Sequence, residues 1–446
     1  MKKIILAICI GFFISLPGKG QNCNASFLGS KTLYQPQQEQ YKAPPAGYLP
    51  VFINHVGRHG ARHLTKDVSS SYAWQVLAKA DSSDGLSAAG RLLKEKILLL
   101  EKIEKPNFKS ISLRGKAEQE GIANRMFGNY VNIFSHAKTV LHIDYTKEIR
   151  TLQTSDAFLA ELKRSINEAM IVKKLNDTTL RFYDMSPAYD AYKENGDWII
   201  YLQQLKTSVK YNDLASTVSR QFFTPAYFKH LTARDQVKLA TDLYGFVTIF
   251  YSIQQEIRDA GYKLSAVDMQ SFLTCAQLAT LKKIDNAEDF YQKGPGTNEG
   301  GIQVKIALPL LADFINTTDE FIKTKAVSAQ LRFGHAETIS PYAALLGLAP
   351  APDASKKTGD IGYKWNADKV IPLSANIQWI IYQKKGSEAY LVKFLLNEKE
   401  VAVKDLNAEI FPYYKWTDVR TFYIKKLQRY NAELHTDFVQ FLKDVK

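Results

Sequence analysis

The chain has 446 residues, of which 46% are hydrophobic, 23% charged and 12% aromatic. This length and composition are typical of a folded protein with more than one domain, and they exclude a small disulfide scaffold and a disordered chain. The formal net charge of +13 favours an anionic partner, which could be nucleic acid, a membrane surface or a phosphorylated substrate.

Residues 1–20 have the pattern of a secretory signal peptide. A basic start is followed by an apolar run from Ile4 to Leu16, and Gly18 and Gly20 provide the small residues of a cleavage site. The run is shorter than the about 20 residues that span a bilayer, so we expect no stable membrane insertion. We expect a mature protein that begins at Gln21 and is secreted or periplasmic. The alternatives are a retained membrane helix and a lipoprotein.

Export changes both the charge and the chemistry of the cysteines. Removal of Lys2, Lys3 and Lys19 with the leader lowers the formal net charge from +13 to +10, and export makes nucleic acid the least favoured partner. The mature chain keeps Cys23 and Cys275, which in an oxidising compartment form either one disulfide or two free thiols.

The elements after the leader alternate between strand and helix patterns. Residues 21–45 lack periodicity and are predicted to be an irregular arm, whereas Leu49–Asn54 is an apolar run typical of a buried parallel strand. Ser87 is predicted to cap a helix that reaches Leu100, and a second helix is expected over 118–134, both packed on a sheet. Further strands are expected over 140–145, 327–333, 377–383 and 390–396, and the last two are expected to form a hairpin. Further helices are expected over 156–166 and 416–442, the first of them capped by Thr154 or Ser155.

The stretch from Ile166 to Tyr262 carries long amphipathic patterns and no strong strand signal. It is predicted to be a mainly helical cap, over 166–264, inserted into an α/β sandwich domain formed by 45–165 and 265–446. Ligands of such sheets bind at the carboxyl ends of the strands, so the residues that follow the first strand are the first place to look for a site.

The chemistry after that strand is carried by Arg58-His59-Gly60-Ala61-Arg62. Two guanidiniums beside a buried strand need an anionic partner, and the planar fork of arginine matches the oxygens of phosphate. Their charges lower the pKa of the imidazole between them, which keeps His59 neutral and able to attack phosphorus. Gly60 would let the backbone approach the phosphoryl group closely.

Two other interpretations of this segment remain open from the residues alone. One is a basic surface loop with no site. The other is a zinc site formed by His55, His59 and His63, whose spacing of four would align them on one face of a helix. Gly57 and Gly60 inside the run disfavour that helix.

The segment resembles the RHGxR signature of the histidine acid phosphatases, the second branch of the histidine phosphatase superfamily. Residues 115–119, Gly-Lys-Ala-Glu-Gln, are similar to the family's G-x-x-E-Q helix start, and Arg150 matches a later arginine at the start of a helix. Residues 395–398, Leu-Leu-Asn-Glu, are also similar to the family. The chain departs from the family pattern at Leu64, where longer forms of the signature have proline, and at Arg114, where threonine is common.

A second set of residues resembles the multiple inositol polyphosphate phosphatase subgroup. His335-Ala336-Glu337 stands where most of the family has a His-Asp pair, and residues 293–296 and 180–183 are also similar to the subgroup. The resemblance implies a histidine-phosphatase-like α/β sandwich with a helical cap, and hydrolysis of inositol polyphosphates, phytate first. The alternatives are a broad-specificity histidine acid phosphatase and a non-catalytic protein that binds phosphoryl ligands.

The resemblance also implies a role for each matching residue. His59 would form a phosphohistidine, Glu337 would protonate the leaving group and then activate water, and neither a metal nor a cofactor is needed. The oxygens of the attacked phosphate would be held by Arg58, Arg62, Arg150 and His335. Lys293 and Arg181 would bind other phosphates of the substrate. The alternative for Glu337, Lys293 and Arg181 is that they are ordinary surface charges.

Overall fold

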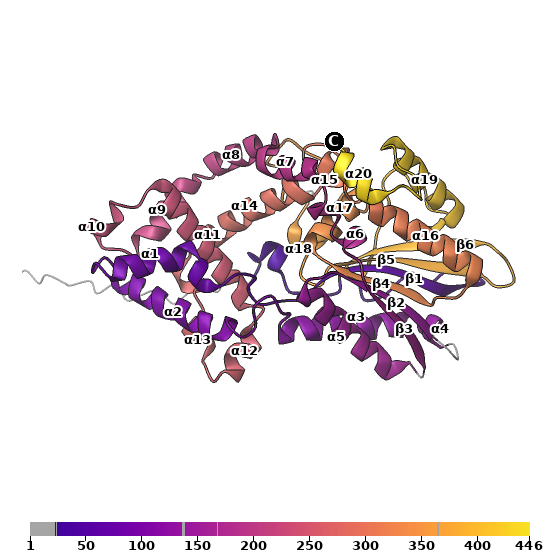
Figure 1. The fold of residues 1–446 in the computed structure, drawn as a ribbon, viewed down its shortest axis with the longest axis horizontal. Helices are drawn as coiled ribbons and strands as arrows, with labels where there is room; N and C mark the ends of the chain where they lie inside the picture. The colour runs from indigo at the N-terminus through magenta and orange to yellow at the C-terminus, as the bar shows by residue number, and fades with distance from the viewer. Residues whose placement is uncertain (1–22, 24, 136–138, 167, 364) are drawn as a thin grey trace, which may run out of the picture.

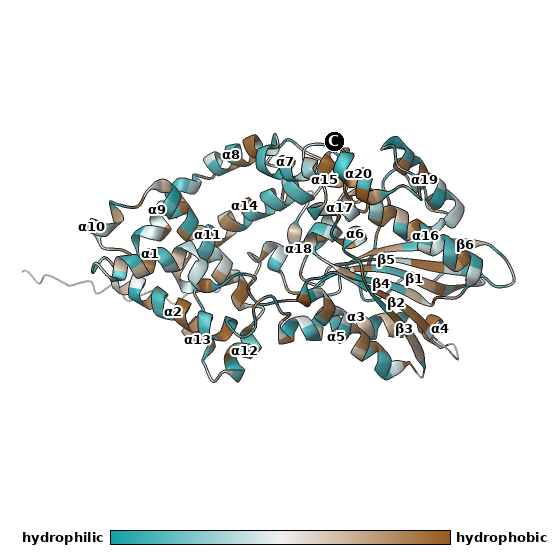
Figure 2. Ribbon diagram, viewed as in Figure 1, coloured by the Kyte–Doolittle hydropathy of each residue, from teal (hydrophilic) through white to brown (hydrophobic). Residues whose placement is uncertain are grey.

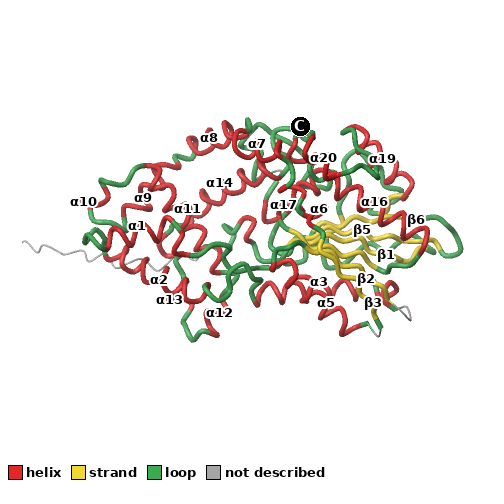
Figure 3. Tube along the Cα trace, in the orientation of Figure 1, coloured by secondary structure: helices red, strands yellow, loops and turns green. Residues whose placement is uncertain are grey.

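The computed structural model describes residues 23, 25–135, 139–166, 168–363 and 365–446. The predicted leader, 1–20, lies outside the described residues. Strands gather in one lobe of the elongated molecule and a group of helices forms the other, as Figures 1 and 3 show. Among the described residues, no helix has both the length and the apolar character needed to cross a membrane.

The sheet of the first lobe is mixed. Its strands are β1 (Tyr48–Arg58), β2 (Thr139–Tyr145), β3 (Ala169–Leu175), β4 (Ala329–Gly334), β5 (Asn376–Lys384), β6 (Tyr390–Leu396), β7 (Lys399–Glu400) and β8 (Tyr413–Lys415). They are arranged in the order β3-β2-β4-β1-β5-β6-β7, and β8 pairs with β6. Strands β1, β2, β3 and β4 are mutually parallel, and β5 and β6 form the predicted hairpin beside β1.

Helices cover both faces of the sheet, so β1 is buried on both sides and its sequence is an almost continuous apolar run. One face packs on α3 (Leu113–Asn129), α4 (Val131–Phe134) and α5 (Ile149–Ser165), where Ile53 and Phe158 share a core. The other face packs on α16 (Leu308–Thr324), α17 (Ala336–Leu346) and α19 (Trp416–Arg429), and Phe52 stacks on Phe321 there. These layers confirm the predicted α/β sandwich.

The second lobe is helical, and hydrophobic and hydrophilic residues alternate along its helices (Figure 2). The remaining helices of the chain are α1 (Tyr72–Asp81), α2 (Ala88–Glu104), α6 (Asp177–Leu180), α7 (Pro187–Asn195), α8 (Trp198–Ser208), α9 (Tyr211–Arg220), α10 (Pro225–Phe228), α11 (Ala233–Phe250), α12 (Gln254–Asp259), α13 (Leu264–Val267), α14 (Cys275–Lys293), α15 (Ile302–Lys305), α18 (Ala367–Val370) and α20 (Phe438–Asp444). The cap boundaries 166–264 stay a prediction, and α1 and α2 pack beside that segment.

The helix expected after Ser87 has the predicted cap but not the predicted neighbours. Ser87 Oγ accepts from Gly90 N, as expected of an N-cap. However, the same hydroxyl donates to the carbonyl of Gln221, and α2 packs on α1 and α13 instead of the sheet. An apolar stripe specifies that a helix face is buried but does not specify its partner.

Three further expectations were wrong. Residues 169–175 form β3 at the edge of the sheet, although no strand was expected there. Its apolar part is only the four residues Ala169–Val172, which Lys173 and Lys174 follow, and this short run was expected to belong to the helical cap. The helix expected over 156–166 begins earlier in the chain, at Ile149. Thr154 and Ser155 lie inside it and donate to carbonyls of its preceding turn, Arg150 O and Leu152 O.

The two remaining long helices are interrupted. The helix expected over 118–134 begins at Leu113 and is divided at Tyr130 into α3 and α4. The run expected over 416–442 is divided into α19 and α20. In each case the apolar periodicity continues through a break in backbone geometry.

Candidate active site

The ends of two adjacent parallel strands bring His59 and His335 together. In the pairing of β1 with β4, Arg58 lies opposite Gly334, and His59 N donates to Gly334 O at 2.9 Å. The two histidines follow directly on these strand ends, and their ring centroids are 5.6 Å apart. The site therefore lies at the carboxyl edge of the sheet, as the sequence predicts.

The loop 58–62 is held by helices on the α3/α5 face. Gly60 N donates to Thr154 Oγ1 at 3.1 Å, and Ala61 N donates to Glu118 Oε2 at 3.0 Å. A Cβ on Gly60 would lie 2.6 Å from the carbonyl oxygen of Gly115. Gly60 is therefore required for the close approach of α3, a reason that the sequence did not reveal.

His59 is buried, with 4% of its surface exposed, and its Nδ1 lies 2.9 Å from Gly60 O. Because a carbonyl oxygen can only accept, Nδ1 carries the proton and Nε2 presents its lone pair. Burial, followed by the charges of Arg58 and Arg150, holds the pKa of His59 well below its usual range. The ring is therefore neutral, as a nucleophile must be.

Three arginines surround this ring, and each has a hydrogen bond to the protein. Arg58 Nη1 donates to Ser30 O at 2.7 Å, Arg62 Nη1 donates to His63 O at 2.8 Å, and Arg150 Nη1 donates to Glu148 Oε2 at 2.8 Å. The Nε atoms of all three are buried without a partner among the described residues. Buried donors without acceptors are rare, and an anion bound beside His59 would satisfy them.

His335 is bonded at both ring nitrogens. Arg150 Nη2 lies 3.2 Å from Nδ1 and can only donate, so Nε2 carries the proton and donates to Thr146 Oγ1 at 3.0 Å. Burial, followed by the charge of Arg150, lowers the pKa of His335 to about 3. In this geometry His335 orients Arg150, and its predicted contact with phosphate stays a prediction.

Glu337 and Lys293 form an ion pair at the same edge. Lys293 Nζ lies 3.0 Å from Glu337 Oε1 and 2.9 Å from Asp289 Oδ1. Burial acts to raise the pKa of Glu337, but the charges of Lys293 and His335 and a hydrogen bond from Lys293 together lower it well below its usual range. Glu337 remains accessible, with 39% of its side chain exposed.

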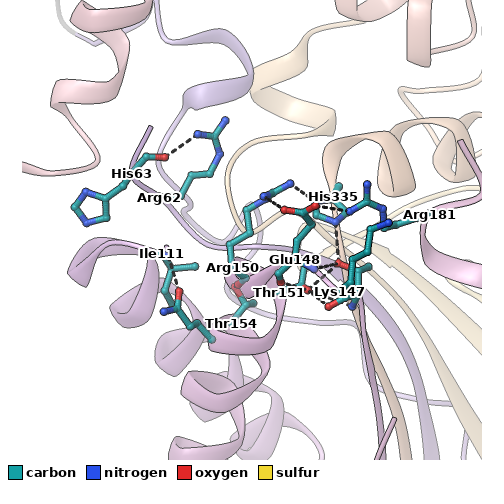
Figure 4. A network of polar contacts seen from close by, with 12 residues as sticks. Arg62, His63, Ile111, Lys147, Glu148, Arg150, Thr151, Thr154, Arg181 and His335 are labelled. Carbon is teal, nitrogen blue, oxygen red and sulfur yellow. Dashed lines mark hydrogen bonds and ion pairs between the residues drawn. The ribbon is translucent and has the colours of Figure 1, made fainter. Parts of the chain in front are cut away.

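Arg181 lies in a chain of charges behind Arg150. Figure 4 shows Arg150, Glu148, Arg181 and His335 side by side, and Arg181 Nη1 donates to Glu148 Oε1 at 2.7 Å. The other side of the Arg181 guanidinium is paired with Asp184. Arg181 therefore reaches the site but has carboxylate partners, and through Glu148 it holds Arg150.

The zinc and surface-loop interpretations are both wrong. His55 lies on β1 between Phe158 and Phe333, and His63 is paired with Glu104 and Glu256, so the three histidines share no face. Among the described residues there is no group of three metal-ligating side chains that could hold an ion. Arg58 and His59 are each 4% exposed, which excludes a surface loop.

Several site residues were not found from the sequence. The sequence assigned no role to three residues that contact or lie near the cluster, Thr146, Glu148 and Lys31. His63, which accepts from Arg62 through its carbonyl, was considered only as a zinc ligand. Glu118 was noted only within a helix-start motif, whereas it accepts a hydrogen bond from the backbone of the loop 58–62. The disulfide that the cysteine count left open is formed between Cys23 and Cys275.

Comparisons with known proteins agree with this geometry. Residues 51–397 match the family model of the histidine phosphatase superfamily, branch 2. The chain is 24% identical over 414 residues to multiple inositol polyphosphate phosphatase 1 of Gallus gallus, covering 87% of this chain and 84% of that protein.

Solved structures show the same fold. The multiple inositol polyphosphate phosphatase of Bifidobacterium longum, in complex with inositol hexasulfate, has a TM-score of 0.77 at 21% identity, over 88% of this chain and 96% of that one. The phytase from D. castellii has a TM-score of 0.61 at 13% identity, over 90% of this chain and 85% of that one. The chain belongs to branch 2 of the histidine phosphatase superfamily.

Proposed function

We propose that the protein is a phosphomonoesterase that hydrolyses inositol polyphosphates through a phosphohistidine. The observation that carries this proposal is the free Nε2 of a neutral, buried His59 surrounded by three arginines with unsatisfied Nε donors. The names of the Gallus gallus relative and of the Bifidobacterium longum neighbour, with its inositol hexasulfate ligand, support the substrate class.

The reaction has two steps. His59 Nε2 attacks phosphorus, the P–O bond to the inositol oxygen breaks, and the leaving alkoxide takes a proton from Glu337. In the second step a water molecule gives a proton to Glu337 and attacks phosphorus, the P–N bond breaks, and inorganic phosphate leaves. The guanidiniums of Arg58, Arg62 and Arg150 neutralise the charge that spreads over the phosphoryl oxygens in both steps.

The site also fits a broad-specificity acid phosphatase, or a binding protein without turnover. Release of inorganic phosphate from phytate and from a small aryl phosphate separates the three functions. We expect both substrates to be hydrolysed and phytate to have the larger kcat/KM. Turnover of the aryl phosphate alone would favour the broad-specificity enzyme, and no turnover of either would favour the binding protein.

The intermediate is tested by labelling. Acid-labile, alkali-stable phosphoryl label is expected on the wild-type protein after rapid quenching, and His59→Ala is expected to lose both the label and turnover, by several orders of magnitude. His435→Ala, at an exposed histidine between α19 and α20, is the control and should retain both. Label that persists in His59→Ala would assign the nucleophile to another residue.

Secretion or periplasmic location is part of the proposal and is tested by fractionation of cells.

A further inference from the structure

The residues before β1 contact the loop of the candidate active site. We define the N-terminal arm as Cys23 and residues 25–34, which precede the stretch 51–397 matched by the family model. The Cys23–Cys275 disulfide ties the arm to the first residue of α14. At the other end of the arm, Tyr34 N donates to Glu118 Oε1 at 2.9 Å. Between these points Tyr244 Oη donates to Phe27 O at 2.7 Å.

The middle of the arm lies against the catalytic arginines. Gly29–Lys31 forms a single 3-10 turn, and the carbonyl oxygen of Ser30 accepts from Arg58 Nη1 at 2.7 Å. Gly29 has a φ of +54°, and a Cβ there would lie 3.3 Å from Asp285 Oδ2, so the turn is packed tightly on α14. Lys31 is the last residue of this turn.

Among the described residues, Lys31 differs from Lys293 and Arg181 in having no carboxylate partner within ion-pair distance. Its ammonium group has no ion pair and no hydrogen bond with the described residues, whereas Lys293 has two carboxylate partners and Arg181 has two. Burial lowers the pKa of Lys31, Asp285 and Asp289 act to raise it, and Arg62 and Arg58 lower it further. Lys31 therefore lies near both Asp285 and the guanidinium of Arg62, with which it shares a cavity.

The space beside Lys31 is large enough for a ligand group. Lys31 and Arg62 line one cavity of about 600 Å³, which extends from the catalytic loop to α1 and α11. Lys66 and Lys238 also line it, and Asp67 and Asp242 are its acidic residues. Three arginines already surround the position beside His59, and His59 does not line the cavity that Lys31 and Arg62 share, so a cation there would meet a different part of a bound substrate.

We propose that Lys31 binds a second phosphate group of the substrate, one that His59 does not attack, and that the Cys23–Cys275 disulfide holds the arm in the position that makes this contact. The inference rests on the proposed function, since only a substrate with several phosphates can use both positions. Specificity for polyphosphorylated substrates then depends partly on the N-terminal arm, which lies outside the residues that match the family model.

The first test compares Lys31→Gln with Lys384→Gln, which removes one exposed lysine at the far end of β5. We expect Lys31→Gln to raise KM for phytate about 10-fold, as for the loss of one charge-assisted hydrogen bond, and to raise KM for an aryl phosphate several-fold less. Lys31→Arg should restore most of the loss, and Lys384→Gln should stay within about twofold of wild type on both substrates. Equal changes on both substrates, or none, would overturn the proposal.

Binding separates this inference from the proposed catalysis. Inositol hexasulfate should bind the full-length His59→Ala protein, and Lys31→Gln in that background should weaken binding about 10-fold by calorimetry. Weakened binding in a protein whose wild type does not hydrolyse phytate would support the Lys31 contact and reject the hydrolase proposal. Unchanged binding would reject the Lys31 contact, whatever the turnover.

The role of the disulfide is tested by a double-mutant cycle. The pair Cys23→Ser and Cys275→Ser should weaken hexasulfate binding, and Lys31→Gln should add little to that loss, because a released arm no longer places Lys31. Full additivity would overturn the role of the disulfide. If the cysteine variant fails to fold, Tyr244→Phe offers the same cycle, since it releases only the hydrogen bond to Phe27 O.

Discussion

Glu337 has to be protonated to act as an acid, yet in the substrate-free protein Lys293 keeps it ionised. The pKa of Glu337 is lowered by its ion pair with Lys293. A substrate phosphate that draws Lys293 away would break this ion pair and raise the pKa of Glu337. The negative charge of that phosphate would then raise the pKa of Glu337 further. Lys293 would therefore serve the reaction through Glu337 in addition to its predicted contact with substrate.

Lys293→Met should raise the pKa of Glu337 in the free enzyme. Because Glu337 would have to be protonated to act as the proposed acid, the alkaline limb of the kcat/KM profile should move to higher pH. Lys293→Arg should keep that limb near its wild-type position. The measurement is a pH profile with an alkyl phosphate, whose poor leaving group needs protonation. An alkaline limb at the wild-type pH in Lys293→Met would show that the ion pair does not control the acid.

Glu337→Gln tests the acid itself. The substitution should reduce turnover of phytate, which has a poor leaving group, far more than turnover of an aryl phosphate, which needs little protonation. Comparable losses on the two substrates would assign the acid to another carboxylate.

At the scale of elements, the catalytic loop depends on how closely α3 approaches it. A Cβ on Gly115 would lie 2.0 Å from Ala61 O, so an alanine there must displace either the helix or the loop. Displacement of reacting groups by about 1 Å can cost about 100-fold in rate. We expect Gly115→Ala to lower kcat by about that factor.

The control for this substitution lies on the same helix. A Cβ on Gly128 would meet no neighbouring group within 4 Å, so Gly128→Ala should leave kcat unchanged and add up to about 1 kcal/mol of stability. Both variants are measured by kcat on an aryl phosphate and by thermal unfolding. Equal activity in the two variants would contradict the proposed packing constraint.

His63 links the catalytic loop to α2 and α12. Its Nδ1 lies 3.2 Å from Glu104 Oε1 and its Nε2 lies 3.5 Å from Glu256 Oε1. Burial acts to lower the pKa of His63, but the hydrogen bonds and charges of the two carboxylates raise it from 6.5 to about 9. A raised pKa in the folded state means that the stabilisation is complete below pH 6.5 and is lost as the pH rises through about 9.

His63→Gln should therefore be destabilised relative to wild type by an amount that depends on pH. The difference in free energy of unfolding should be on the order of 3 kcal/mol larger at about pH 6 than at about pH 10. Denaturant unfolding at the two pH values measures it. A difference that does not change with pH would mean that His63 is neutral in the folded protein.

At the scale of the whole molecule, the excess of basic residues affects distant phosphates more than the attacked one. The formal net charge is +13, and in about 0.5 M salt the Debye length is roughly 4 Å, so partly solvated contacts are strongly screened. Arg58, Arg62 and Arg150 would hold the attacked phosphate through short, buried hydrogen bonds, which salt screens less. KM for phytate should therefore rise steeply with salt, and KM for an aryl monophosphate should rise much less. Parallel salt curves would favour a general acid phosphatase.

The sequence by itself predicted the central strands β1, β2, β4, β5 and β6 of the sheet lobe and the basic motif at the end of β1, whose catalytic role stays a prediction. A continuous apolar run predicts a strand buried on both faces, and the basic motif that follows it must lie at the strand end. The leader pattern, the charge balance and the family resemblance likewise depend only on the order of residues. The positions of His59, Arg58 and Arg62 follow from these local signals.

Only the tertiary structure decided which charges are paired and where amphipathic helices pack. The sequence does not show which cations are paired. The fold places Glu337 and Asp289 beside Lys293, and Glu148 and Asp184 beside Arg181. Among the described residues, Lys31 has no carboxylate within ion-pair distance. Periodicity shows that a helix face is buried but not what covers it, so α2 was expected on the sheet and lies in the helical lobe. Ion pairs act over a few ångströms between residues far apart in sequence, and the folded backbone alone sets those distances.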